Sequence, residues 1–259
     1  MTRWARFMAD GVPTFGTLDG NTLAEHSGDM FGTSTGTGRT FELDGAELLI
    51  PVVPGKVVAL ANNFHALLTK SGGTVPVEPL YFFKSNSSLH PTGKPILRPA
   101  GYDGKIVFEG ELGLVIGKTC QNVSAADALD YLFGCTCIND VTAIEILNED
   151  PSFPQWTRCK AADTFGVMGP VVATGLDPGA LTVRTTLDDS ERQNYPITDM
   201  AFTPAELIAR ISRDMRLEAG DVIACGTNVG VGSMRPGNTV TIKIDGVGAL
   251  VNQFEPAAG

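Results

Sequence analysis

The chain has 259 residues, of which 43% are hydrophobic and 19% are charged, and its formal net charge at pH 7 is −10. That composition is typical of a globular protein long enough to bury a substantial core. The negative charge, without any cluster of basic residues that could neutralise phosphates, argues against a nucleic-acid partner, so we expect small metabolites as partners.

No apolar segment reaches the ~20 residues that a membrane helix needs. The opening residues Met1–Arg6 also lack the apolar core of a signal peptide. We therefore expect no membrane partner and a cytoplasmic location. The five cysteines have no CxxC spacing, which predicts reduced and mostly buried thiols. With only three scattered histidines, no zinc site is expected.

Short apolar runs alternate with turns at the start of the chain, which predicts a small domain rich in β-strands. The runs are 4–7, 12–16 and 46–50. Prolines and a glycine in Pro51–Gly55 indicate a boundary at that point. We therefore predict an N-terminal domain over residues 1–53 and a larger domain over residues 54–259.

The rest of the chain predicts further strands with a few short helices between them. Strands are expected at 56–60, 80–84, 105–117, 133–142, 181–186, 222–227 and 239–244. Helices are expected at 61–70, 124–132 and 204–211. Ser124 and Thr203 are the expected N-caps of the last two helices, because their hydroxyls can accept the first free backbone N–H groups. The fold class is therefore a mixed, β-rich α+β arrangement.

Two polar features near the first predicted helix and the second predicted strand could have a function. His65 lies near the start of the helix at 61–70, just beyond a strand end, where functional residues often lie. It is either a catalytic group or a surface histidine. The polar run Ser85–Ser88 follows the strand at 80–84 and either offers hydroxyls and amides to an anion or forms a solvated turn.

The strand at 105–117 contains two glutamates that share a face. Alternation places Glu109 and Glu111 together, opposite Phe108 and Leu112. Their Cα atoms would lie about 6.5 Å apart, from a rise of about 3.3 Å per residue. A hard divalent cation would relieve the repulsion between the two carboxylates. The alternative is a half-exposed strand with an acidic outer face.

Two further charged residues stand in unusual surroundings. The near-continuous apolar strand at 133–142 includes Asp140, and a buried carboxylate is costly unless it is paired, hydrogen-bonded or bound to a metal. Lys160 lies in a segment rich in glycine and polar residues, at 156–170. It either balances an anionic substrate or is a surface lysine.

Taken in order, the motifs resemble the fumarylacetoacetate hydrolase family over residues 54–254. The matching segments are FEGEL at 108–112 with VIGK at 115–118, NDVT at 139–142, KAADTF at 160–165 with GP at 169–170, RQ at 192–193, LEAGDVI at 217–223, GT at 226–227 with GVG at 230–232, and PGN at 236–238. Each segment is short, and their shared order carries the resemblance. It implies a rolled β structure with a small N-terminal β domain.

The resemblance also implies a metal site and a substrate class. By it, Glu109, Glu111 and Asp140 would bind Mg²⁺ or Mn²⁺, with waters or substrate completing an octahedral shell. Family substrates are 2-oxo acids or acylpyruvates that chelate the ion, which then stabilises an enolate. Lys160 would be the electrostatic partner of the substrate carboxylate or enolate. Members usually dimerise, so a homodimer is expected.

Further site residues are assigned by the same resemblance. His65 occupies the position of a catalytic histidine, and Gln193 and Thr227 would contact substrate oxygens. Ser85, at the start of the polar run, is a further candidate for substrate binding.

The chain departs from the family pattern around the substrate. In hydrolytic members a glutamate three residues after the histidine helps to activate water, and Leu68 stands in its place. Asn62–Asn63 replace a Tyr-Arg pair, Ile144 replaces the arginine that often follows the metal aspartate by four residues, and Asn228 replaces the proline of Gly-Thr-Pro. We therefore expect a retained cation site with altered specificity or reaction.

Three functions compete at this point. The leading hypothesis is a metal-dependent enzyme that acts on a 2-oxo or 1,3-dicarbonyl acid by C–C hydrolysis or decarboxylation. An alternative is a keto–enol or double-bond isomerase of aromatic catabolism, similar to a 2-hydroxyhepta-2,4-diene-1,7-dioate isomerase, which activates no water and so tolerates Leu68. The third is a catalytically silent protein that binds a metal or an oxo acid.

Overall fold

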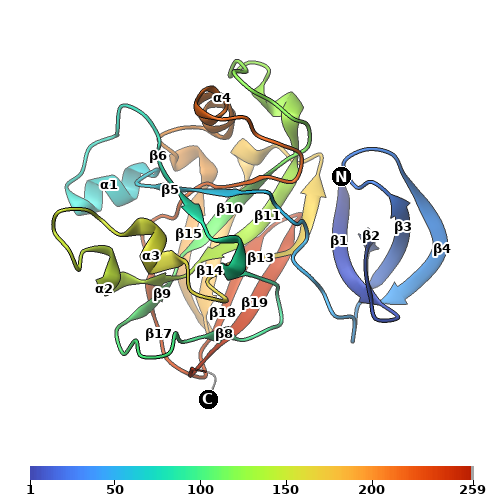
Figure 1. Ribbon diagram of the computed structural model, residues 1–259, viewed down its shortest axis with the longest axis horizontal. Helices are drawn as coiled ribbons and strands as arrows, with labels where there is room; N and C mark the ends of the chain where they lie inside the picture. Colours follow the sequence, from blue (N-terminus) through green and yellow to red (C-terminus); the bar gives the residue numbers. More distant parts are fainter. Residues whose placement is uncertain (258–259) are drawn as a thin grey trace.

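The computed structural model describes residues 1–257 and consists mainly of strands, with three short helices at the left of Figure 1 and a longer one at the top. The strands are β1 (Thr2–Ala9), β2 (Val12–Asp19), β3 (Thr22–Gly28), β4 (Ser34–Glu42), β5 (Val57–Ala61), β6 (Leu80–Lys84), β7 (Leu89–His90), β8 (Ile96–Leu97), β9 (Ile106–Phe108), β10 (Gly110–Ile116), β11 (Leu132–Asp140), β12 (Thr142–Ala143), β13 (Gly166–Thr174), β14 (Thr182–Leu187), β15 (Ser190–Pro196), β16 (Val222–Ala224), β17 (Gly232–Met234), β18 (Thr239–Ile244) and β19 (Gly248–Glu255).

The α-helices are α1 (His65–Ser71), α2 (Ile144–Leu147), α3 (Trp156–Lys160) and α4 (Pro204–Asp214). Single 3₁₀ turns are η1 (Asn86–Ser88), η2 (Ala128–Tyr131), η3 (Pro178–Ala180) and η4 (Ile197–Asp199). Among residues 1–257, no helix has the length and apolarity to cross a membrane.

The first four strands form an antiparallel meander at one end of the molecule (Figure 1). Asp10 and Gly11 connect β1 to β2, both with positive φ, which is the backbone of a tight two-residue hairpin turn. The predicted N-terminal β domain is therefore confirmed. The apolar run at 46–50 is not a strand of it, because Leu48 makes only an isolated bridge to Phe7.

The N-terminal sheet continues into the main body through β1, which pairs with β13 between Thr2 and Trp4. The resulting large sheet has the order β4-β3-β2-β1-β13-β11-β10-β16-β5-β6. A second sheet has the order β15-β14-β18-β19-β8, and a third has β12-β9-β17. The N-terminal strands thus extend a sheet that also carries β10 and β11.

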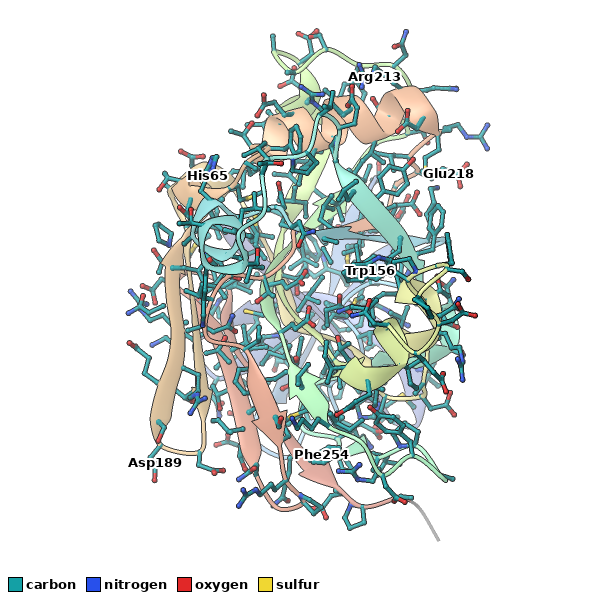
Figure 2. All side chains as sticks on the ribbon, turned by 90° about the vertical axis from the view of Figure 1, so that its left-hand side faces the viewer. His65, Trp156, Asp189, Arg213, Glu218 and Phe254 are labelled. Carbon is teal, nitrogen blue, oxygen red and sulfur yellow. The ribbon has the colours of Figure 1, made fainter. Side chains whose placement is uncertain are left out.

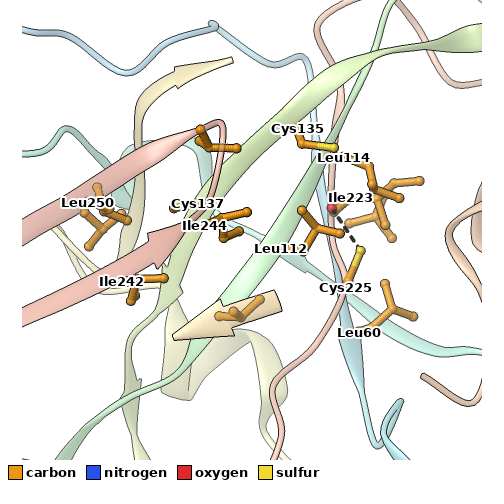
Figure 3. Packing of buried hydrophobic residues seen from close by; sticks show 14 of the residues in the cluster. Leu60, Leu112, Leu114, Cys135, Cys137, Ile223, Cys225, Ile242, Ile244 and Leu250 are labelled. Carbon is orange, nitrogen blue, oxygen red and sulfur yellow. Dashed lines mark hydrogen bonds between the residues drawn. The ribbon is translucent and has the colours of Figure 1, made fainter. Parts of the chain in front are cut away.

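The main core contains buried side chains of both larger sheets (Figure 3). Leu112 and Leu114 of β10 belong to the same buried cluster as Ile242 and Ile244 of β18. On β10 the next residue in alternation, Val115, belongs to a second buried cluster on the opposite face. Both faces of this strand are buried, which excludes the half-exposed strand considered from the sequence.

Two of the predicted helices differ from the observed ones. The helix expected at 124–132 is only the 3₁₀ turn η2, although the Ser124 hydroxyl still accepts a hydrogen bond from the backbone N–H of Asp127 at 3.3 Å. Helix α1 begins at His65 and not at residue 61, because Asn62 has a φ of 55°. That left-handed conformation cannot continue a right-handed helix.

Helix α4 begins with the predicted cap. The Thr203 hydroxyl accepts from the Glu206 backbone N–H at 3.4 Å, and the Glu206 carboxylate accepts from the Thr203 N–H at 2.8 Å. We expect Thr203→Ala to lower the free energy of unfolding by about 1 kcal/mol in urea titrations, because one helical N–H loses its partner. Thr203→Ser should keep the wild-type stability, and a loss in both variants would contradict the cap.

Glu206 adds a pH dependence to this cap. Its hydrogen bonds from Thr203 hold the pKa of its carboxyl below the ordinary value, so the ionised form stabilises the fold at neutral pH. That contribution is lost as the pH falls through the lowered folded-state pKa. We therefore expect Glu206→Gln to be less stable than wild type at pH 7, with the difference disappearing near pH 3 in thermal unfolding.

Candidate metal centre

The two glutamates lie where the predicted strand at 105–117 is interrupted. Strand β9 ends at Phe108 and β10 begins at Gly110, and the two strands belong to different sheets. Between them, Glu109 donates its backbone N–H to Asn139 Oδ1 at 3.0 Å and accepts one from the Asp140 N–H at 2.9 Å. The prediction of one continuous strand was therefore wrong at Glu109, and the break brings the end of β11 against it.

The structure brings three carboxylates together at this break. One oxygen each of Glu109, Glu111 and Asp140 lies within 4.8 Å of the others. Glu111 is fully buried and Asp140 is 1% exposed. Glu111 Oε2 accepts the Gly226 N–H at 2.9 Å, while the buried Glu111 Oε1 has no hydrogen bond. A buried oxygen without a donor is costly, and a hard cation would satisfy it.

The protonation of Glu111 reflects this crowding. Burial, and then the neighbouring charges of Asp140 and Glu109, raise its pKa well above the ordinary value. Three oxygen donors without sulfur or imidazole match Mg²⁺ or Mn²⁺. The residues present therefore fit the ion that the sequence predicted.

Lys160, the last residue of α3, lies against two of these carboxylates. Its Nζ is 2.9 Å from Glu109 Oε2 and 2.7 Å from Asp140 Oδ2. It donates to Thr142 Oγ1 at 2.6 Å, and Thr142 donates to Glu109 Oε1 at 2.8 Å. Burial lowers the pKa of Lys160, but Asp140, Glu109 and Glu111 raise it more, so the net shift is upward and the group is an ammonium. It is therefore a fixed cation beside the carboxylates.

A second buried lysine, Lys84 at the end of β6, was not predicted as a site residue. Its Nζ donates to Asp140 Oδ1 and to the Lys160 carbonyl, and its side chain is 1% exposed. Burial raises the pKa of Asp140, but Lys160 and Lys84 lower it more, so the net shift is downward. A lysine that closes an apolar strand was the only signal for it in the sequence.

Gln193 and Thr227 both contact the peptide between the two glutamates. Gln193 Oε1 accepts the Gly110 N–H at 3.0 Å, and its Nε2 donates to Thr227 Oγ1 at 2.8 Å. Thr227 and Tyr195 donate their hydroxyls to the Gly110 carbonyl. Only glycine fits at 110, because a Cβ there would lie 2.1 Å from Thr185 Oγ1. Gln193, Thr227 and Tyr195 thus hold the segment that carries Glu109 and Glu111.

This arrangement predicts a metal defect in Gln193→Leu. The variant leaves the buried Gly110 N–H without an acceptor, which should cost about 1–3 kcal/mol in urea unfolding. We expect a 10–100-fold weaker Mn²⁺ affinity in calorimetric titration, as for other residues that orient metal ligands. If Gln193 acts only on the substrate, Mn²⁺ affinity stays at the wild-type value and only KM rises.

The structure places His65 and Ser85 away from these groups. His65 is exposed at the start of α1 and does not line the cavity described below, and Leu68 is 5% exposed (Figure 2). The Ser85 hydroxyl is hydrogen-bonded to the Ser87 hydroxyl at 2.7 Å, and the Ser85 carbonyl accepts from Ser88. Ser85 also does not line that cavity.

Helix α1 is anchored by residues that depart from the family pattern. The buried Asn63 carboxamide donates to the Cys225 carbonyl at 2.9 Å and accepts the Phe202 N–H at 3.0 Å. Asn228 donates to Asp199 Oδ2 at 2.8 Å, and the same oxygen accepts the N–H of Ala66, in the first turn of α1, at 3.1 Å. These asparagines therefore fix the helix in the position that leaves His65 facing outward.

A cavity of about 140 Å³ opens beside the carboxylates. Its lining residues are Leu60, Ala61, Asn62, Leu67, Glu109, Thr142, Ile144, Leu147, Trp156, Lys160, Thr227 and Val231. Glu109 and Lys160 are the two ionisable groups among them. A bound oxo acid would therefore meet the carboxylate centre at one end and apolar side chains elsewhere.

The family model described as Fumarylacetoacetate (FAA) hydrolase C-terminal matches residues 56–255, and one described as Rv2993c-like, N-terminal matches residues 2–51. The chain belongs to the fumarylacetoacetate hydrolase family. Protein Rv2993c of Mycobacterium tuberculosis is 38% identical over 94% of both chains. Oxaloacetate tautomerase YisK of Bacillus subtilis is 34% identical over 79% of this chain and 71% of its own.

Two solved structures are similar over nearly the whole chain. The 2-hydroxyhepta-2,4-diene-1,7-dioate isomerase from Mycobacterium marinum has a TM-score of 0.91 and 34% identity, with all of both chains covered. The maleylpyruvate hydrolase from Sphingobium sp. SYK-6, in complex with manganese (II) ion and pyruvate, has a TM-score of 0.81 and 25% identity, and covers 99% of this chain and 100% of its own. Isomerases, hydrolases and a tautomerase of this family establish the chain as a family enzyme of the broad acylpyruvate or isomerase type.

Proposed function

We propose that the chain is a divalent-metal-dependent isomerase that moves a proton in a 2-oxo or 1,3-dicarbonyl acid, by keto–enol or double-bond isomerisation. The observation that carries this proposal is the content of the cavity. Among the described residues that line it, Glu109 and Lys160 are the ionisable ones, and both belong to the carboxylate centre. Hydrolysis needs a base that activates water, whereas isomerisation needs only a group that takes a proton from one substrate atom and returns it to another, a role proposed below for His65.

The residues have separate roles in this proposal. Glu109, Glu111 and Asp140 would bind Mg²⁺ or Mn²⁺, which when bound acts as a Lewis acid toward the substrate oxygens. The Lys160 ammonium lies beside the centre and would stabilise negative charge that develops on the substrate. Asn62, which also lines the cavity, can donate to substrate oxygens, and Thr227 would do so only by releasing the Gly110 carbonyl. The apolar side chains exclude bulk water.

The comparisons support this choice. The similar M. marinum structure is titled an isomerase and the B. subtilis relative is named a tautomerase. The manganese ion in the Sphingobium structure supports a divalent metal without selecting Mn²⁺ over Mg²⁺ for this chain. C–C hydrolysis or decarboxylation, the leading hypothesis from the sequence, is the second candidate because that same structure is of a hydrolase.

Solvent deuterium exchange separates these functions. The protein would be incubated with Mg²⁺, Mn²⁺ or EDTA and with acetylpyruvate or oxaloacetate in D₂O, followed by NMR and enol absorbance. We expect metal-dependent acceleration of enol–keto interconversion and of deuterium uptake at C3, without cleavage products. If acetate, CO₂ or free pyruvate appeared faster than deuterium at C3, the function would be C–C hydrolysis or decarboxylation. Substrate-induced thermal stabilisation without turnover would select the silent binder.

His65 remains a proposed proton carrier. Because it is exposed at the start of α1, it would act only on a substrate atom that reaches the cavity mouth. If it carries the proton, His65→Gln should lower the exchange rate about 10²–10⁴-fold without changing Mn²⁺ affinity. The exposed His65→Gln change should leave thermal stability intact, and wild-type exchange in this variant would remove His65 from the mechanism.

Three further proposals accompany the function. The domain boundary lies at residues 53/54, the location is cytoplasmic, and the chain forms a homodimer. Multi-angle light scattering of the full chain tests the last of these, and a monomer mass at micromolar concentration would contradict it.

A further inference from the structure

The lining of the cavity becomes apolar with distance from the carboxylates. Leu67 of α1, Ile144 and Leu147 of α2, and Val231 form walls that are wholly apolar. Ile144 stands four residues after Asp140, where the family pattern often has an arginine. Apart from Lys160, which already pairs with Glu109 and Asp140 at the carboxylate end, the lining residues offer no cation to a second carboxylate on a bound oxo acid.

A second compartment adjoins the first. It measures about 320 Å³ and is lined by Ala61, Pro79, Leu80, Tyr81, Phe82 and Trp156. Ala61 and Trp156 line both compartments. The rings of Phe82 and Trp156 stack at 5.6 Å and 15°, and Figure 2 shows Trp156 on α3, on the far side of the molecule's centre from His65. The two compartments thus adjoin at Ala61 and Trp156, and the second, toward β6, has an apolar and aromatic lining.

Size decides which part of a substrate lies where. The first compartment, at about 140 Å³, has less than half the volume of the second, at about 320 Å³. A pyruvyl head would lie in the first, beside Glu109 and Lys160. A longer tail would extend past Trp156 toward the second compartment, where the lining residues are apolar or aromatic.

We propose that this enzyme binds 2-oxo acids with an apolar tail more tightly than those with a second carboxylate. The inference rests on the proposed function and names its substrate class. Beyond the reach of Lys160, a second carboxylate would lie beside the half-buried Ile144, Leu147 and Trp156. It would lose part of its hydration there without an ion-pair partner, which is unfavourable. The preference also departs from the dioate named for the similar M. marinum structure.

Two nearly isosteric ligands test the preference. 5-Methyl-2-oxohexanoate and 2-oxoglutarate differ in carrying an isopropyl group or a carboxylate at the same position. With Mn²⁺-loaded protein, we expect calorimetry to show at least 10-fold tighter binding of 5-methyl-2-oxohexanoate. Equal affinities, or tighter 2-oxoglutarate, would overturn the inference. If pyruvate also fails to bind, the proposed function itself is wrong, so the two failures are distinguishable.

Substitutions at the apolar wall sharpen the test. Ile144→Arg supplies the missing cation and should improve 2-oxoglutarate binding at least 10-fold, while Ile144→Leu should keep the wild-type ratio. If Ile144→Arg does not fold, Val231→Arg places a guanidinium on the same wall from a residue that is 39% exposed. A folded arginine variant with the wild-type ratio would overturn the inference.

A separate experiment tests whether the substrate tail occupies the second compartment. Leu80 is 48% exposed on its edge, so Leu80→Glu should fold and place a negative charge in the lining of this compartment. We expect phenylpyruvate to bind at least 5-fold more weakly to this variant, with pyruvate unchanged. If phenylpyruvate binds as tightly as to wild type, the tail does not occupy this compartment.

Discussion

Glu111→Gln is expected to abolish metal binding while making the metal-free protein more stable. The glutamine keeps an oxygen for the Gly226 N–H and is neutral at every pH, so it avoids the cost of ionising a third carboxylate beside Glu109 and Asp140. Loss of a ligand should weaken Mn²⁺ affinity by more than about 100-fold, beyond the cost of losing an orienting residue. Isomerisation should fall in parallel. Calorimetric Mn²⁺ titration and thermal unfolding in EDTA measure the two effects.

The pH dependence of the wild-type protein follows from the same residue. Burial and its neighbours raise the pKa of Glu111 well above 4.5, so the metal-free folded chain holds this proton more tightly than the unfolded chain. Metal-free stability therefore falls as pH rises from about 4.5 through the folded-state pKa. Because the metal displaces this proton, we expect a larger Mn²⁺-induced thermal shift at pH 8 than at pH 6.

A matched variant controls for the loss of a surface charge. Glu191→Gln changes an exposed glutamate of β15 and should leave metal binding and metal-free stability unchanged. If Glu111→Gln is less stable than wild type in EDTA, or still binds Mn²⁺ with wild-type affinity, Glu111 is not part of a strained cation site.

Lys160→Met is expected to give the largest loss of stability. It removes the buried cation from Glu109 and Asp140 and leaves both carboxylates partly uncompensated. Breaking a buried pair in this way typically costs about 3–5 kcal/mol. Because the pKa of Lys160 is raised, its contribution should be constant between pH 6 and 9 and decline only in strongly alkaline solution. Urea unfolding in EDTA across this range is the measurement.

The metal should rescue this variant in part, since Mn²⁺ supplies the missing positive charge. Lys56→Met is the control, because Lys56 pairs with the buried carboxylate of Asp221 and lines no part of the candidate site. Both variants should be destabilised in EDTA, but only Lys160→Met should show a larger Mn²⁺ shift than wild type. Equal shifts in the two variants would show that Lys160 acts independently of the cation site. Isomerisation in Lys160→Met should fall about 10²–10³-fold.

The strand-rich fold and the carboxylate cluster were predictable because their signals are local. The apolar residues along 110–116 indicate a buried strand that contains Glu111. The apolar run that ends at Asn139–Asp140 indicates a second buried strand with a carboxylate at its end. The order of the family motifs then predicted that Glu109, Glu111 and Asp140 meet, and the structure brings their oxygens within 4.8 Å.

The strand break at Glu109 and the hydrogen-bond partner of Gln193 could not be predicted from the sequence. The break at Glu109 arises because β9 pairs with β12 and β17 while β10 pairs with β11 and β16, and the alternation of side chains carries no information on partners. Likewise, Gln193 was predicted to bind substrate, but its carboxamide bonds the Gly110 peptide, 83 residues away in the chain.

By itself, the sequence determined the chemical content of the site: three hard oxygen donors, a lysine, and apolar residues at 68 and 144 where polar ones are usual. The tertiary structure decided what these groups face. Asn63 and Asn228 hold α1 so that His65 points outward, and Lys84 reaches Asp140 from a strand 56 residues earlier. Sheet register and long-range hydrogen bonds set such contacts, and they exist only once distant segments pack together.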